Sequence, residues 1–373
     1  MTTAAATPAL PAKDLRRFPW LFSPALDLAA FGGSAAVSLA LLALGAARGW
    51  LTTDTPEWTW ITTVLLVDVA HVYATAFRVY FDAAEWRRRR WLYSLTPLLA
   101  WLLGAALYSE SSELFWRLLA YVAVFHFVRQ QYGWVALYRA RAGERGRVGQ
   151  FIDTAAVYAA TLYPLLYWHT HLPRHFGWFS LRGEFVALPE WCAAAAFPFY
   201  VAALAAYAVR SLWRGVSLGQ WSPGKDLVVA TTALCWYLGI VTFNSDYAFT
   251  VTNVVIHGVP YIVLVEWYRE RSGHAAPAAK RSPLIRWLPY LGALWLMAYV
   301  EELLWDRGVW HERTWLFGAN WPLDIPAYVL VPLLTMPQLT HYLLDGFIWR
   351  RRTNPQVAQW TQAPAPGHNP PRA

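Results

Sequence analysis

The chain has 373 residues, of which 57% are hydrophobic and only 14% charged, and its mean hydropathy is +0.27. A soluble domain carries about a quarter charged residues, so this composition excludes an ordinary soluble protein and indicates a polytopic membrane protein. The net charge of +8 does not indicate a nucleic-acid partner, because the basic residues stand in short clusters between apolar stretches. The two cysteines, Cys192 and Cys235, provide neither a disulfide framework nor a cysteine-based metal motif.

Apolar stretches follow one another along the chain, and each is long enough to cross a bilayer as a helix, which takes about 17–25 residues. They cover residues 27–47, 58–81, 91–108, 114–138, 150–169, 190–212, 226–243, 247–268, 284–304 and 324–349. We therefore expect an all-α bundle of about ten transmembrane helices. The N-terminus lacks a signal-peptide pattern, so the first stretch is interpreted as a retained helix.

Arginine and lysine cluster in every second connection between these stretches. The basic connections are 83–90, 139–149, 210–225 and 269–286. By the positive-inside rule these connections face the cytoplasm, and so do both termini. The expected organisation is a cytoplasmic N-terminal segment (1–26), a transmembrane helical domain (27–349) and a disordered cytoplasmic tail (350–373) rich in Pro, Gln and Ala.

Aromatic residues make up 17% of the chain, which fits belts at both membrane–water interfaces. The connection 305–323 carries Trp305, Trp310, Trp315 and Trp321, and we expect it to lie in the outer interface and to cap the bundle. Arginine exceeds lysine, a bias typical of GC-rich bacterial genomes. The expected location is therefore a bacterial inner (plasma) membrane, with the lipid bilayer as a partner.

A polar stripe marks the second stretch and its inner end. Its members are Asp68, His71, Thr75, Arg78 and Asp82. Their spacing puts them on one face of a helix whose other positions are Val, Ala, Tyr and Phe. Ionisable groups at membrane depth are costly and usually face the bundle interior, so the stripe predicts a functional site.

Four histidines lie in the second, fourth, eighth and tenth stretches, which all run in the same direction across the membrane. They are His71, His126, His257 and His341. The inner edges of these stretches are taken at Asp82, Arg139, Arg269 and Arg350. At about 1.5 Å per residue, the histidines stand roughly 14–20 Å from these edges. The sequence therefore predicts one histidine layer near mid-membrane, on the cytoplasmic side.

Each histidine has polar neighbours on its own helix face. Residues expected to orient the ligands or complete the coordination sphere are Asp68, Asp345, Gln338 and Asn253. Residues expected to position a substrate or oxygen are Arg129, Gln130 and Tyr261. A metal-bound imidazole usually donates its second N–H to a carboxylate or carbonyl, which fixes the tautomer and the ring orientation. This pattern predicts a metal site ligated by the four histidines.

Neutral imidazole with carboxylate suits iron, zinc or manganese. The first hypothesis is a membrane-embedded oxidoreductase with a histidine-ligated metal, non-haem iron as the first choice, a lipid-soluble substrate and a redox partner. Two further hypotheses stay open. One is a proton-coupled carrier whose His/Asp stripe lines a water-filled path, and the other is a haem-binding membrane electron carrier. Packing histidines without a ligand are the structural alternative.

Dispersed intramembrane histidines in a polytopic chain resemble the arrangement in bacterial β-carotene cleavage enzymes. The likeness is one of arrangement, without an extended shared motif. What it implies is a helical membrane fold with non-haem iron. The chain is not assigned to that family.

A second histidine group, His169, His171 and His175, has the spacing His-x-His-x3-His near the outer end of the fifth stretch. This spacing is compatible with a metal site. Pro173 and Gly177 in the same segment favour a solvent-facing loop instead.

Overall fold

The computed structural model describes residues 18–179, 183–273 and 283–362, and the secondary structure of that part of the chain consists of helices, without a strand. Several helices contain a wider π-helical segment, labelled η. The first half comprises α2 (Pro24–Asp27), η1 (Leu28–Gly33), α3 (Ser34–Arg48), α4 (Glu57–Thr59), η2 (Trp60–Val69), α5 (Ala70–Val79), α6 (Ala83–Arg88), α7 (Arg90–Glu110), α8 (Ser112–Arg141) and α9 (Arg147–Thr170). The second half comprises α10 (Trp191–Leu218), α11 (Pro223–Trp236), η3 (Tyr237–Thr242), α12 (Asp246–Phe249), η4 (Thr250–Val254), α13 (Val255–Arg271), α14 (Pro283–Trp305), η5 (Asp306–Trp310), α15 (Thr314–Phe317), α16 (Ala327–Ile348) and α17 (Pro355–Trp360).

Helical segments cover every stretch predicted to span the membrane. Within the described ranges, six helices are long and apolar enough to cross it: Pro24–Arg48, Glu57–Val79, Arg90–Glu110, Trp191–Leu218, Pro223–Thr242 and Asp246–Arg271. These helices indicate an integral membrane protein. That α8, α9, α14 and α16 also cross, and that the termini face the cytoplasm, remain predictions.

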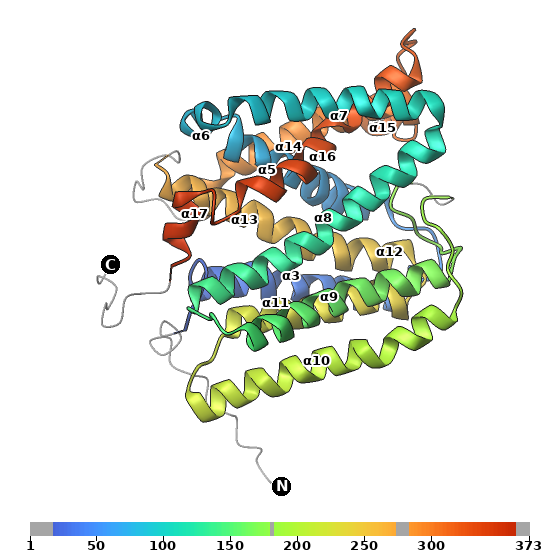
Figure 1. The fold of residues 1–373 in the computed structure, drawn as a ribbon. Coiled ribbons are helices and arrows are strands. Elements are labelled where there is room, and N and C mark those ends of the chain that lie inside the picture. The colour runs from blue at the N-terminus through green and yellow to red at the C-terminus, as the bar shows by residue number, and fades with distance from the viewer. Residues whose placement is uncertain (1–17, 180–182, 274–282, 363–373) are drawn as a thin grey trace.

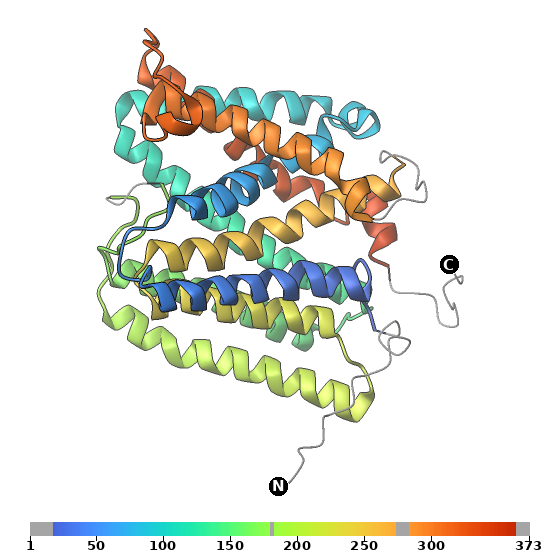
Figure 2. The same cartoon turned by 180° about the vertical axis from the view of Figure 1, so that it is seen from behind.

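The long helices lie side by side, with α7 at one edge of the bundle, α10 at the opposite edge and α13 between them (Figures 1 and 2). The most apolar window of the segment from α12 to α13 is 94% buried, against 17% for α7 and 11% for α10. The two edge helices carry exposed large apolar side chains, among them Leu99, Leu103, Phe199 and Val216. Such an exterior suits lipid, because apolar patches of this extent are rare on proteins surrounded by water.

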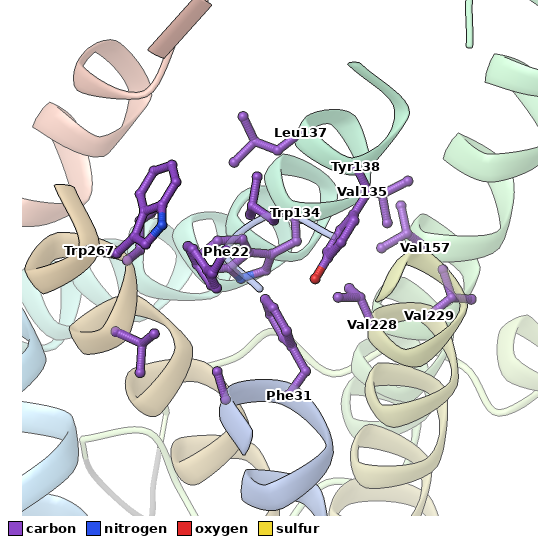
Figure 3. Close-up of a cluster of buried hydrophobic side chains, with 14 of the residues drawn as sticks. Phe22, Phe31, Trp134, Val135, Leu137, Tyr138, Val157, Val228, Val229 and Trp267 are labelled. Carbon is purple, nitrogen blue, oxygen red and sulfur yellow. The ribbon is translucent and has the colours of Figure 1, made fainter. Parts of the chain in front are cut away.

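Aromatic side chains fill the core between η1, α8 and α13 (Figure 3). The Phe22 ring meets that of Trp267 edge-to-face at 5.2 Å, and Phe31 meets Trp134 in the same manner at 5.1 Å. Edge-to-face pairs bring the positive ring edge to the negative face and add about 0.5–1.5 kcal/mol each to the area effect. This packing fixes α13, the central helix, against its neighbours.

An ionic cluster joins α9, α10 and α11 at one end of the bundle. Glu144, in the connection between α8 and α9, accepts hydrogen bonds from Lys225 at 2.7 Å and Arg210 at 3.1 Å, and it also pairs with Arg214. Asp153 on α9 accepts from Arg210 at 2.8 Å and from Lys225 at 3.0 Å. Basic residues interpreted from sequence as topology signals therefore also hold α9, α10 and α11 together.

The predicted disordered tail needs a correction. Residues 350–362 are described, and within them α17 packs on the bundle, with Val357 only 4% exposed and Trp360 edge-on to Trp267 at 5.4 Å. These apolar contacts favour an ordered segment. The prediction of disorder rested on the average composition of the tail, which does not show that Val357 and Trp360 can pack on the bundle. Residues 363–373 lie outside the described part.

The two described ends of the chain meet at one end of the bundle. The Arg141 guanidinium donates to the backbone carbonyl of Trp20 at 3.1 Å and to that of Gln362 at 2.9 Å. Because one side chain reaches both segments, residues near 20 and 362 lie on the same side of the molecule.

Candidate metal centre

The four predicted histidines converge. His71 on α5, His126 on α8, His257 on α13 and His341 on α16 each place one ring nitrogen within 4.8 Å of the others, and all four side chains are buried. The predicted convergence is confirmed. This cluster could hold a metal ion.

The spacing of the ring nitrogens tests whether one ion fits. The Nε2 atoms of His71 and His257 are 3.1 Å apart, and those of His126 and His341 are also 3.1 Å apart. With metal–nitrogen bonds of about 2.0–2.1 Å, ligand nitrogens around one four-coordinate ion lie roughly 3–4 Å from each other. The observed separations, with an upper limit of 4.8 Å, match a single ion with small adjustments of the rings.

His71 is held in the tautomer that a ligand needs. Its Nδ1 forms a short hydrogen bond with the backbone carbonyl of Asp68, one helical turn earlier. A carbonyl only accepts, so Nδ1 must carry the proton and Nε2 is left with its lone pair. The Asp68 carboxylate is 3.6 Å from the same Nδ1, so the residue orients His71 mainly through its backbone.

A chain of hydroxyl groups sets the tautomer of His341. Tyr261 donates its phenolic proton to the Asp345 carboxylate at 2.6 Å. The Thr75 hydroxyl, 2.9 Å from the Tyr261 oxygen, must then donate to it, and is free to accept a hydrogen bond from His341 Nδ1 at 2.7 Å. Since Nδ1 is the donor, Nε2 of His341 faces the cluster with its lone pair.

His126 and His257 are placed differently. His126 Nδ1 is 3.8 Å from the second carboxylate oxygen of Asp345, which is too far for a direct hydrogen bond. The His257 ring stacks on Phe127 with 3.5 Å between centroids, and its buried Nδ1 has no hydrogen-bond partner. Stacking, rather than a hydrogen bond, orients this ring.

The other predicted site residues are distributed around the cluster. Gln130 donates to the backbone carbonyl of His257 at 2.8 Å, so it braces α13. The Asn253 amide bonds to the Phe249 carbonyl of its own helix at 3.2 Å. Arg129 is exposed and donates to the Tyr158 hydroxyl, so the fold does not bring it to the histidines.

Two residues near the cluster had no predicted role. Thr75 was part of the polar stripe, but its bond to His341 joins positions 266 apart in the chain, a separation that no sequence spacing reveals. The Tyr342 ring lies 4.8 Å from the ring of His126. Adjacency to His341 was the one signal that could have identified it.

The C-terminal part of the polar stripe, Arg78 and Asp82, has a structural role. Arg78 is fully buried, with a guanidinium nitrogen 3.4 Å from the Glu85 carboxylate and its Cζ 4.1 Å from the centroid of the Tyr268 ring. Asp82 caps the start of α6 and accepts a hydrogen bond from Tyr268 at 2.7 Å. The stripe therefore divides into a half at the histidine cluster and a structural half.

A cavity of about 440 Å³ adjoins the histidine layer on the side of η5 and the 177–179 segment. Its aromatic lining consists of Trp60, Trp116, Trp178, Phe179, Trp305 and Trp310. Its polar lining consists of Asp68, Asp246, Glu302, Glu312, Arg313, Thr335 and Gln338. Gln338, predicted near the metal, thus faces this cavity.

The second histidine group does not form a metal-binding cluster among the described residues. His169 pairs with the Tyr121 hydroxyl at 3.1 Å and with the Leu165 carbonyl at 2.6 Å, and His171 stacks on Tyr167 at 3.7 Å. These contacts hold the end of α9 against its surroundings.

Comparisons with known proteins do not assign this chain to a family. The chain matches no family model, no curated protein and no solved structure.

Proposed function

We propose that the protein is a membrane-embedded oxidoreductase that uses a histidine-ligated metal ion, iron as the first choice, on a lipid-soluble substrate. One observation carries the proposal: four buried imidazoles from four helices place their ring nitrogens within 4.8 Å of one another. Burying that many polar groups together costs free energy unless a ligand uses them, so a structural role alone accounts poorly for the cluster.

The donor set suits iron or zinc, because neutral imidazole is a good ligand for both. Four protein ligands leave two positions open on an ion that accepts six, and bound iron would supply one-electron chemistry there. The residues of the chain hold the ligand rings in position: Asp68 and Thr75 fix two tautomers, while Asp345 anchors the hydroxyl chain. The buried setting keeps reacting groups away from water.

The apolar exterior of the protein supports a lipid-soluble substrate. The edge helices α7 and α10 present apolar side chains outward, so the molecule exchanges most easily with compounds dissolved in the bilayer. Haem is the less suitable cofactor. It needs two axial ligands with a flat macrocycle between them, and here two further imidazoles occupy the space around the same point.

Metal analysis with an absorption spectrum tests the proposal. The purified wild-type protein should contain about one iron per chain without a haem Soret band. His257→Ala and His341→Ala should each lose most of the metal, because each removes a ligand and leaves an incomplete set. His175→Ala is the matched control, since this exposed histidine lies outside the cluster and its loss should leave the metal content unchanged.

Two results would contradict the proposal in different ways. A Soret band lost together with His257 would identify a haem protein. A wild-type protein free of metal, in which ion or solute flux across vesicles depends on His71, would identify a carrier.

A further inference from the structure

The aromatic cavity beside the histidine layer touches the metal centre through Asp68. One Asp68 carboxylate oxygen is 3.6 Å from His71 Nδ1, yet the Asp68 side chain is 34% exposed while that of His71 is 1% exposed. Asp68 also lines the cavity. The Asp68 side chain therefore borders the cavity on one side and His71 on the other.

Acidic side chains outnumber basic ones in the cavity lining. It carries four carboxyl groups, from Asp68, Asp246, Glu302 and Glu312, and one basic side chain, Arg313. Arg313 is already paired, with Glu57 at 2.5 Å and with Glu312 at 3.1 Å. A cleft lined by one sign of charge with low-dielectric walls concentrates ions of the opposite sign. Carboxylate oxygens are also suitable ligands for divalent cations.

On the other side of His71 along α5, the fully buried Arg78 forms an ion pair with Glu85 at 3.4 Å. Its guanidinium packs between the rings of Tyr268 at 4.1 Å and Trp349 at 5.3 Å. A cation approaching the histidines from that end would have to displace this buried pair in a low-dielectric interior. Entry from the cavity side is therefore favoured.

We propose that this cavity is the loading route of the metal centre: a divalent cation enters at its rim, passes along Glu302 and moves past Asp68 to the Nε2 atoms of the histidine cluster. The inference rests on the metal centre proposed above. It adds a role for residues that do not ligate the ion in its final position.

The test measures the rate of metal loading rather than any activity. The full-length protein is stripped of metal in detergent, Co²⁺ is added, and its ligand-field absorption is followed in time. The double variant Asp246→Asn/Glu302→Gln should load about tenfold or more slowly than wild type, and its rate should depend less on ionic strength. Asp54→Asn, which removes an exposed carboxylate outside the cavity lining, is the matched control and should load at the wild-type rate.

A second variant closes the route without changing its charge. Val64 lines the cavity, and Val64→Cys in a Cys192→Ala background offers one thiol for a bulky reagent, while Cys235 stays buried. Labelling should slow loading and leave the final Co²⁺ stoichiometry at one. Unchanged rates in both variants, with full loading, would overturn the route alone. A wild-type protein that takes up no Co²⁺ would instead overturn the metal centre itself.

Discussion

At the scale of single residues, the partners of the histidine nitrogens that face away from the cluster would set how tightly the proposed site holds a metal ion. His341 depends on a hydroxyl chain that begins at Thr75 and ends at the Asp345 carboxylate. The ligand and its support come from different helices. A substitution in this hydroxyl chain therefore tests the site and leaves all four imidazoles in place.

Replacing Thr75 with valine keeps the shape of the side chain and removes its hydroxyl. His341 Nδ1 would lose its acceptor, so the ring could rotate or take the other tautomer. We expect metal affinity to fall by about 10- to 100-fold, the usual cost of losing such a supporting contact. Competition with a chelator of known affinity measures the change.

Thr75→Ser is the control, because it retains the hydroxyl and should bind metal nearly as wild type does. If Thr75→Val bound metal as tightly as Thr75→Ser, the hydroxyl chain would have no part in holding the ligand.

At the scale of helices, the site depends on how closely α13 approaches η2. Gly258, next to His257, has so little room that an added Cβ would lie 2.7 Å from Val67 Cγ1 and 3.1 Å from the Val67 carbonyl oxygen. Wider π-helical turns immediately precede His71 and His257, in η2 and η4. Such turns shift the helix face by one residue and are frequent at functional sites.

Gly258→Ala should push α13 away from η2 and separate His257 from His71. Overpacking of this kind costs about 1–3 kcal/mol in the free energy of unfolding, and the metal should bind more weakly as well. Thermal unfolding in detergent and metal titration would show both effects.

Gly133→Ala on α8 gives the comparison, because nothing lies within 4 Å of its added Cβ. There the same substitution should be neutral or stabilising by up to about 1 kcal/mol. Equal behaviour of the two variants would mean that the α13–η2 contact does not constrain the site.

At the scale of the whole molecule, the edge helix α10 is held to the bundle partly by the ionic cluster around Glu144. Burial acts to raise the pKa of this carboxyl, but the charges and hydrogen bonds of Lys225, Arg210 and Arg214 lower it from 4.5 to about 2. A group whose pKa is depressed by folding stabilises the folded state above its unfolded pKa, and this contribution is lost as the pH falls toward the folded value. The loss is therefore expected between pH 4.5 and 2.

Wild-type protein in detergent should accordingly show falling resistance to unfolding across this range. Glu144→Gln should be less stable at neutral pH by about 1–3 kcal/mol, because Lys225 and Arg210 then keep only Asp153 as a carboxylate partner and Arg214 loses its own. It should also lose less stability on acidification. Glu113→Gln removes an exposed carboxylate, and should change neither quantity appreciably. A wild-type acid profile retained in Glu144→Gln would assign the acid sensitivity to other groups.

The sequence by itself determined the helical character of the chain, its apolar exterior and the position of each of the four histidines along its own helix. Helix formation and hydrophobicity are properties of neighbouring residues, and a constant rise per residue places each histidine along its own helix. The same reasoning gave Asp345 and Gln130 a position close to the centre, because residues four apart share a helix face.

Only the tertiary structure decided which groups meet across helices. Thr75 supports His341 and not its own neighbour His71, Arg129 turns outward, and Glu144 binds cations from two helices, α10 and α11. These contacts join residues distant in the chain, and π-helical turns rotate the faces that a regular period would predict. Pairings of this kind follow from the packing of the helices against each other, which no local pattern encodes.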